Sequence, residues 1–213
     1  MIKRLILCAA VMLGTGSAAL AGLIPPPWYG DDGSTHQQWS FSDSSLTPQP
    51  DVVDNDYGTP LLGVVPMGDW LQDPGAWPLS GQAWPFSGQI DVYIPNRPEL
   101  LPFKEILLQL TWMPAESDFS PFLPNQPVVG ITSNPFTRME MSRQDTLGQS
   151  DWIDSLFTIT LYPNPYEEWI TIKGDILVDQ LEIYTICVPE PTTLALLGIG
   201  ALVAFSRRKR LPV

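Results

Sequence analysis

Histidine and cysteine, the side chains that most often build metal and nucleophile sites, are almost missing from this sequence. The 213 residues include two cysteines and one histidine. Cys8 lies in an apolar run near the N-terminus, which leaves Cys187 alone in the body and excludes an intramolecular disulfide there. The single histidine, His36, cannot build a histidine-rich metal site, and we expect it on the surface or on an edge strand.

The sequence also lacks the short motifs of the common catalytic machineries. It contains no G-x-S-x-G elbow, no phosphate-binding loop and no zinc-ligand spacing. Paired carboxylates that cleave glycosides remain an alternative, because acidic residues are plentiful. The candidates, which no sequence feature separates, are Glu105, Glu116, Glu140, Glu167 and Glu168. We predict a non-catalytic body without a cofactor, with a secreted glycan-active hydrolase as the alternative.

Basic side chains are scarce outside the two ends. Six of the 11 lysines and arginines lie at positions 3, 4 and 207–210. The other five share residues 22–191 with all 23 acidic residues, which gives this segment a formal charge of −18. Such a charge repels nucleic acid and anionic lipid, so nucleic acid is excluded as a partner.

The N-terminus has the three parts of a secretory signal peptide. Lys3 and Arg4 precede an apolar run over residues 5–13, and Ala19 and Ala21 form a small-x-small cleavage site. We predict that residues 1–21 are a signal peptide, removed by signal peptidase after Ala21.

A short apolar stretch near the C-terminus is followed by four basic residues. Residues 192–205 are 14 residues without a charge. As a helix they span roughly 21 Å, less than the usual ~30 Å hydrocarbon core. Arg207 to Arg210 stay on the cytoplasmic side, and their long stems extend the effective span. We predict one transmembrane helix over about 192–206, with the acidic body translocated.

The last part of the chain combines a proline-rich start, the apolar stretch and a basic end, in the residues Val188, Pro189, Glu190, Pro191, Arg207, Arg208, Lys209 and Arg210. With these residues it resembles the bacterial PEP-CTERM sorting signal, a segment also labelled the ice-binding protein C-terminal domain. The resemblance covers residues 188–210 and implies processing near Pro189-Glu190-Pro191 by an exosortase, a membrane protease-transpeptidase. It also implies anchoring in the bacterial envelope by the C-terminal helix, then delivery to the cell surface or the extracellular polysaccharide.

Between these ends, residues 22–187 favour strands over helices. The 23 prolines are spread along the chain, which disfavours long helices. Apolar residues alternate in several segments, as in Ile90, Val92 and Ile94. The expected strands cover residues 36–41, 61–65, 89–94, 105–112, 128–132, 155–162, 168–173 and 176–186, with a turn at 173–175. We predict an antiparallel β-sandwich, similar to a jelly roll.

Tryptophan is the main candidate for ligand binding. All eight tryptophans lie in the body, and most of them should pack in the core. Trp77 and Trp84 occupy a polar tandem repeat, AWPLSGQ followed by AWPFSGQ, and are predicted to stack on sugar rings. The predicted partner is an extracellular polysaccharide.

Calcium is a further candidate ligand, because hard cations bind carboxylate and carbonyl oxygens. Asp31 and Asp32 lie in the turn-like stretch GDDGS, and Asp179 lies in GDILVDQLEI. The second stretch resembles the last strand of carbohydrate-binding jelly-roll modules, where an acidic residue helps to hold a structural calcium. The sequence therefore offers Asp31, Asp32 and Asp179 as metal ligands.

Overall fold

The computed structural model describes residues 24–41, 45–66, 84–115, 124–133, 138–147 and 152–188. Within these ranges the chain is all-β and contains no helix. The nine strands are β1 Ser34–Trp39, β2 Val52–Asp54, β3 Leu61–Pro66, β4 Trp84–Pro95, β5 Phe103–Pro114, β6 Val128–Ser133, β7 Arg138–Leu147, β8 Ile153–Tyr162 and β9 Glu167–Val188.

All nine strands join one antiparallel sheet, and β9 is its hub. The first part of β9 pairs with β4 along one edge and with β6 along the other. The second part pairs with β1 and with β5. The sheet then extends through β8 to β7, from β1 to β2, and from β4 to β3. One strand of 22 residues therefore holds two groups of strands together.

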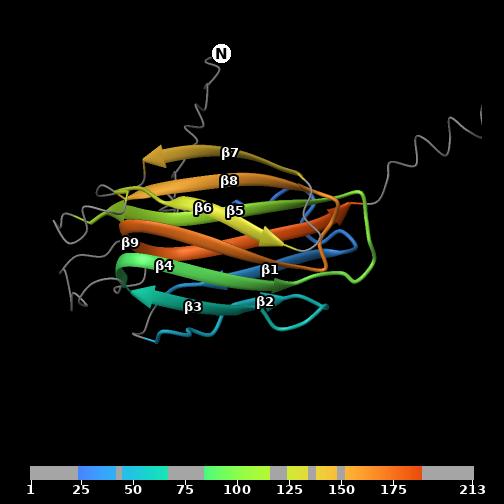
Figure 1. The fold of residues 1–213 in the computed structure, drawn as a ribbon, viewed down its shortest axis with the longest axis horizontal. Coiled ribbons are helices and arrows are strands. Elements are labelled where there is room, and N and C mark those ends of the chain that lie inside the picture. Colours follow the sequence, from blue (N-terminus) through green and yellow to red (C-terminus); the bar gives the residue numbers. More distant parts are fainter. Residues whose placement is uncertain are drawn as a thin grey trace, which may run out of the picture.

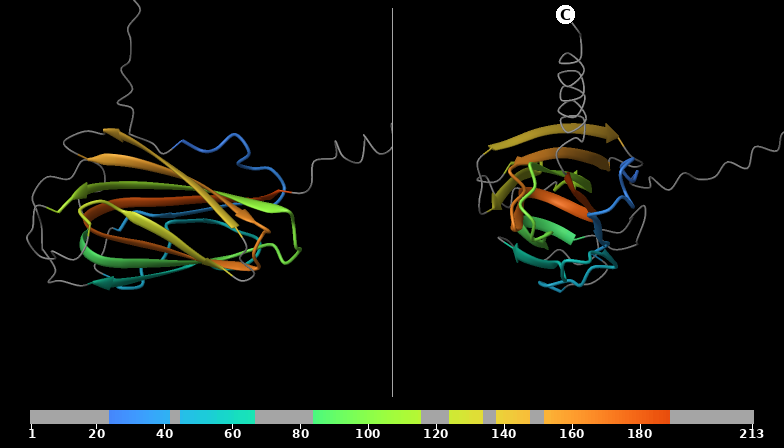
Figure 2. Two further views of the ribbon diagram at one scale, coloured as in Figure 1. Left: turned by 45° about the horizontal axis from the view of Figure 1, so that its top comes forward. Right: turned by 90° about the vertical axis from the view of Figure 1, so that its right-hand side faces the viewer.

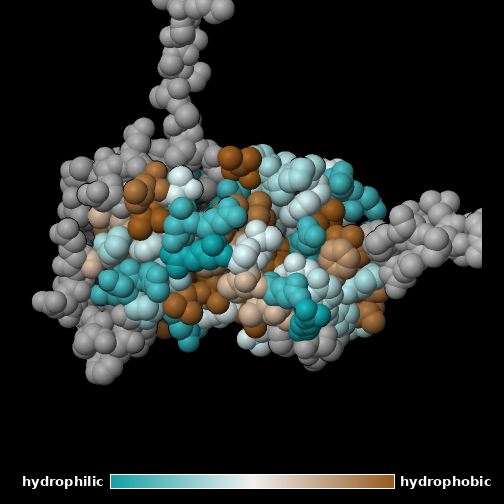
Figure 3. All heavy atoms as spheres, turned by 90° about the horizontal axis from the view of Figure 1, so that it is seen from above, coloured by the Kyte–Doolittle hydropathy of each residue, from teal (hydrophilic) through white to brown (hydrophobic). Residues whose placement is uncertain are grey.

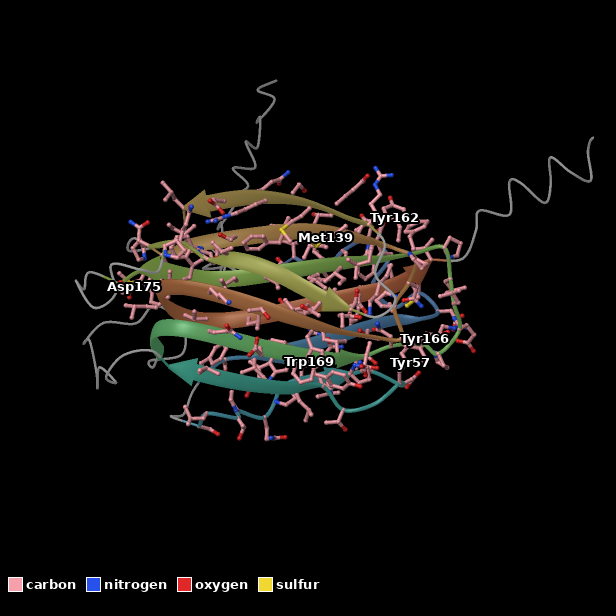
Figure 4. All side chains as sticks on the ribbon, in the orientation of Figure 1. Tyr57, Met139, Tyr162, Tyr166, Trp169 and Asp175 are labelled. Carbon is pink, nitrogen blue, oxygen red and sulfur yellow. The ribbon has the colours of Figure 1, made fainter. Side chains whose placement is uncertain are left out.

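The strand β9 bends at Gly174 and Asp175, so that its two arms lie in different layers (Figures 1 and 2). Asp175 lies at the end of the molecule where the arms meet (Figure 4). A β-carbon at Gly174 would meet the carbonyl oxygen of Gln126 at 3.1 Å. The amide of Asp175 donates to the carbonyl of Pro124, and its carbonyl accepts from the amide of Ala115. These contacts fix the bend between β5 and β6.

One hydrophobic core fills the space between the layers. Alternate residues of most strands point into it, because successive side chains of a strand point to opposite faces. The core side chains come from both arms of β9 and from the strands beside them, as in Ile90, Val92, Ile94, Ile106, Leu108, Leu110, Phe157, Ile159, Leu161, Ile170, Ile172, Leu181 and Ile183. The folded-over sheet thus encloses a shared apolar interior.

The all-β prediction is confirmed, and each of the expected strands overlaps an observed one. The expected turn at 173–175 is the bend inside β9, whose ladder with β4 continues through Gly174 and Asp175. The sequence interpretation missed β2 and β7. Both faces of β7 are largely exposed, and Figure 3 shows apolar and polar residues interspersed on this side of the molecule.

Several predictions fall on residues outside the described ranges. They include the signal peptide, the transmembrane helix and Trp77, together with the sorting residues after Val188. Within the described ranges, no helix is long and apolar enough to cross a bilayer.

Candidate functional site

The outer face of the layer formed by β3, β4, β6 and the first arm of β9 carries an aromatic pair, the exposed Trp169 and the half-buried Tyr93. Trp169 is 44% exposed, and its ring centroid lies 5.1 Å from that of Tyr93. The two residues are direct neighbours across the β4–β9 ladder. The Tyr93 hydroxyl donates to the Glu167 carboxylate at 3.1 Å, which fixes the phenol ring. Figure 4 shows Trp169 over this layer.

Polar side chains continue this face next to the aromatic pair. Asp91 accepts hydrogen bonds from the Thr171 hydroxyl at 2.9 Å and from the Gln89 amide at 2.8 and 2.7 Å. The neighbours across the outer ladders are Gly63 on β3 and Gly130 on β6. A β-carbon at either glycine would meet nothing within 4 Å. The row through Gly130, Thr171, Asp91 and Gly63 is therefore open beside the rings. We call this row, together with the neighbouring pair Trp169 and Tyr93, the aromatic face.

In the opposite layer, His36 is buried, and not on the surface or on an edge strand as expected. This residue is only 7% exposed, and its Nε2 lies 2.6 Å from Oε1 of Glu182. The same oxygen accepts from the Tyr184 hydroxyl at 2.7 Å. His36 and Tyr184 stack with centroids 4.2 Å apart, and Tyr29 packs edge-on against both. The histidine is buried because β1 lies between β2 and β9, and the turn before β1 covers it.

A second polar group lies inside the protein, at the end of the core away from the β9 bend. Lys104 of β5 and Glu168 of β9 are both fully buried, and Lys104 Nζ lies 2.6 Å from Glu168 Oε1. Asn96, which follows β4, is 7% exposed and touches both. Its Oδ1 accepts from Lys104 Nζ, and its Nδ2 donates to Glu168 Oε2 and to the carbonyl of Pro165. We call these three residues the buried triad.

Burial shifts the pKa of two groups, one in the buried triad and one beside it. Burial raises the pKa of Glu168, while Lys104 and Asn96 act in the opposite direction. Cys187 lies across the ladder from Lys104, and its Sγ donates to Oδ1 of Asn164 at 3.2 Å. Burial also raises the pKa of this thiol.

The three aspartates proposed for calcium do not meet. Asp32 pairs with Arg97 at 3.1 Å, and Asp31 lies beside it in the turn before β1. Ser34 at the start of β1 is opposite Ile186, so Asp179 lies seven residues away along β9, roughly 23 Å in extended chain. Asp179 is buried at the register shift where Thr111 faces Gln180 and Trp112 faces Val178. Among the described residues, no group of three His, Cys, Asp or Glu could hold a metal ion.

The described glutamates considered for glycoside cleavage are spread over β5, β7 and β9, and the consecutive residues Glu167 and Glu168 point to opposite faces of β9. Glu168 belongs to the buried triad, and Glu140 pairs with Arg138 on the exposed strand β7. Glu167 lies at the edge of the aromatic face, and Glu105 pairs across the ladder with Ile186. Glu116 and Trp77 lie outside the described residues; Trp84 begins β4, at the end of that strand next to the β9 bend.

The sequence interpretation missed Lys104 and Asn96, although a signal was present. Lys104 is two positions before Ile106, and Glu168 is two positions before Ile170, both of which are fully buried. Each charged residue is therefore in phase with the core face of its strand. A charge in phase with an apolar stripe indicates an inward-facing polar partner, and two such charges of opposite sign predict a pair.

The described part of the chain defines an all-β body that ends at the last residue of β9, Val188. From there, residues 188–210 match the PEP-CTERM protein-sorting motif, which confirms the resemblance seen in the sequence. The motif implies an exported protein that is processed by an exosortase and sorted to the cell surface or beyond. Comparison with curated proteins and with solved structures gave no match.

Proposed function

We propose that this is a cell-surface or extracellular-matrix protein whose sandwich-like, jelly-roll-type body binds polysaccharide and is not catalytic. The observation that carries the proposal is the aromatic face, where the exposed ring of Trp169 lies beside Tyr93 and the Asp91 cluster. Indole and phenol rings stack on sugar faces, and carboxylate and amide groups bind hydroxyls.

The charge of the body narrows the class of polysaccharide. Residues 22–191 carry a formal charge of −18, so a polyanionic polymer would be repelled from most of the surface. A neutral polysaccharide, or one with amino groups, suits this surface better. Lys173, across the ladder from Gln89, is a basic residue at the border of the aromatic face.

The proposal that the body is not catalytic depends on the positions of the carboxylates that the structure describes. The glutamates that might have formed a catalytic pair are enclosed, engaged by arginine or placed on different strands. An open sheet face with two rings suits binding along a polymer better than cleavage of one bond.

Pull-down with an insoluble polysaccharide tests the proposal. The extracellular polysaccharide of the producing cells is the first probe, and a neutral β-glucan is the second. We expect Trp169→Ala to lower the bound fraction about tenfold, because loss of one stacked ring costs about 1–1.5 kcal/mol. The matched control is Tyr166→Ala, which removes another exposed ring, 55% exposed, at the end of the molecule (Figure 4). Equal binding by the wild type and Trp169→Ala would show that the aromatic face does not bind these polymers.

A further inference from the structure

The buried triad has a chemical arrangement that an ordinary ion pair does not need. A primary amine, a carboxamide and a carboxyl group meet in one place with almost no exposure to solvent. The amine of Lys104 contacts the carboxamide of Asn96 directly, and Glu168 contacts the nitrogen atoms of both. A nucleophile, an acylating group and a proton carrier are therefore in mutual contact.

The setting of the buried triad is apolar. Ile94, Ile106 and Ile170 are fully buried, and each is two positions from one member of the buried triad. An isolated charge is costly in such surroundings. Transfer of one proton from Lys104 Nζ to the Glu168 carboxylate leaves a neutral amine and a neutral acid. Burial raises the pKa of Glu168, which favours this transfer.

We propose that Lys104 and Asn96 become joined by an intramolecular isopeptide bond, with Glu168 as the catalytic proton carrier. The neutral Nζ of Lys104 attacks Cγ of Asn96 and forms a tetrahedral intermediate. Glu168 takes a proton from Nζ through one carboxylate oxygen and supplies a proton to Nδ2, which its other oxygen already contacts. The Cγ–Nδ2 bond breaks and ammonia leaves. The product is a secondary amide, and no oxidant or cofactor is consumed.

The position of the bond indicates a structural role, which is to hold two layers of the sheet together. Asn96 follows β4, which pairs with the first arm of β9, and Lys104 is in β5, which pairs with the second arm. The bond would join the two layers at the end of the molecule away from the β9 bend. Phe103 and Val188 form the last pair of the β5–β9 ladder, so the bond lies beside the point where the sorting motif begins. It does not depend on polysaccharide binding.

Peptide mass spectrometry of the full chain, purified from the producing cells, tests the proposal directly. A protease that cleaves after glutamate cuts after Glu99 and Glu105, which separates Asn96 from Lys104. Cleavage before Asp91 shortens the first peptide. In the wild type we expect residues 91–99 and 100–105 to remain joined, at the summed mass of the two peptides less one ammonia, about 17 Da. Fragment ions should place the link on Lys104.

Three variants separate catalysis from packing. Glu168→Gln keeps the size of the side chain and one of its two acceptor oxygens but cannot carry the proton, so we expect the two peptides to separate almost completely. Asn96→Ala removes the acylating group and should have the same effect. Cys187→Ser changes the neighbour of Lys104 across the ladder, keeps a donor for Asn164, and should leave the link intact.

The wild-type spectrum decides the matter even where a variant fails to fold. Recovery of residues 91–99 and 100–105 only as separate peptides at their full masses, from soluble wild-type protein, would overturn the proposal. A link that persists in Glu168→Gln would overturn the role given to Glu168. Deamidation of Asn96, which adds about 1 Da, is distinguishable from both results by mass.

Discussion

At the scale of single residues, Gly33 is held in a conformation that other residues rarely adopt. Its φ is +84°, and a β-carbon there would meet the Arg97 guanidinium at 3.3 Å and the Tyr57 hydroxyl at 3.6 Å. We expect Gly33→Ala to lower the free energy of unfolding by about 1–2 kcal/mol, because a left-handed backbone is unfavourable for alanine.

Urea denaturation measures this change, and Gly63→Ala is the matched control. A β-carbon at Gly63 would meet nothing within 4 Å, so the control should stay within about 0.5 kcal/mol of the wild type. Equal losses in both variants would contradict the argument from conformation.

The hydroxyl of Tyr184 makes the stability of the protein sensitive to alkaline pH. Burial, and then the hydrogen bond to Glu182 and the charge of that residue, raise the pKa of Tyr184 above its ordinary value. The folded protein thus holds this proton more firmly than the unfolded chain, whose tyrosines titrate near ~10. The stabilisation is present below pH ~10 and is lost as the pH rises through the folded-state pKa.

Comparison of the wild type with Tyr184→Phe tests this sign. Between pH 10 and 12, we expect the free energy of unfolding of the wild type to fall by about 1 kcal/mol more than that of Tyr184→Phe. The variant should also be less stable at pH 7 by about 1.5–3 kcal/mol, because it loses a hydrogen bond to a charged group. Parallel pH profiles for the two proteins would contradict the prediction.

At the scale of elements, β7 is a long strand with little cover. It pairs with β8 alone, and both of its faces are largely exposed. Beyond the ladder with β8, Arg143 attaches it through its side chain. The guanidinium lies 5.3 Å from the Phe157 ring centre and 5.6 Å from that of Trp112, donates to the carbonyl of Pro127, and pairs with Asp145 at 2.7 Å.

We therefore expect Arg143→Ala to speed amide hydrogen exchange in β7 about fivefold, with little change in β5 and β9. Loss of the cation–π contacts costs about 1 kcal/mol, which corresponds to that factor for local opening. Glu140→Gln, which removes an exposed ion pair on the same strand, should change exchange far less. Uniform acceleration over the whole sheet would show that β7 does not open by itself.

The same strand shows what the sequence could not predict. Ile90, Val92 and Ile94 have one buried face, so their alternation revealed a strand directly. The sequence RMEMSRQDTL of β7 buries neither face and leaves no such pattern. The expected strand over 168–173 puts Trp169, Thr171 and Lys173 on one side, and no other pattern in the sequence points to the aromatic face. Its partner Tyr93 comes from β4, and only the long-range ladder brings it beside Trp169.

Buried charges posed a different difficulty. Lysine and glutamate are rarely fully buried, so residue type alone favours the surface for Lys104 and Glu168. Their phase with Ile106 and Ile170 favours the interior instead. The choice between surface and interior depends on the partner Asn96, which lies 72 positions from Glu168, and no local pattern shows this partner.

At the scale of the whole molecule, the sorting motif begins where the folded body ends. Val188 is the last residue of β9 and still pairs with Phe103, and Pro189 and Pro191 have no amide hydrogen to continue a ladder. Proline also restricts the residue before it to extended conformations. The two prolines of the motif therefore disfavour a helix directly after the central strand.

We expect Glu190→Ala to block processing, because this carboxylate is the one polar side chain that Pro189-Glu190-Pro191 offers for recognition. The uncharged stretch 192–205 would then remain on the chain, and the protein should collect in the membrane fraction at full C-terminal mass. Mass spectrometry of envelope and medium fractions measures both. Glu140→Ala removes a body carboxylate on β7 and should be processed like the wild type. A Glu190→Ala protein that reaches the medium with the wild-type C-terminus would show that the exosortase recognises the prolines or the basic end instead.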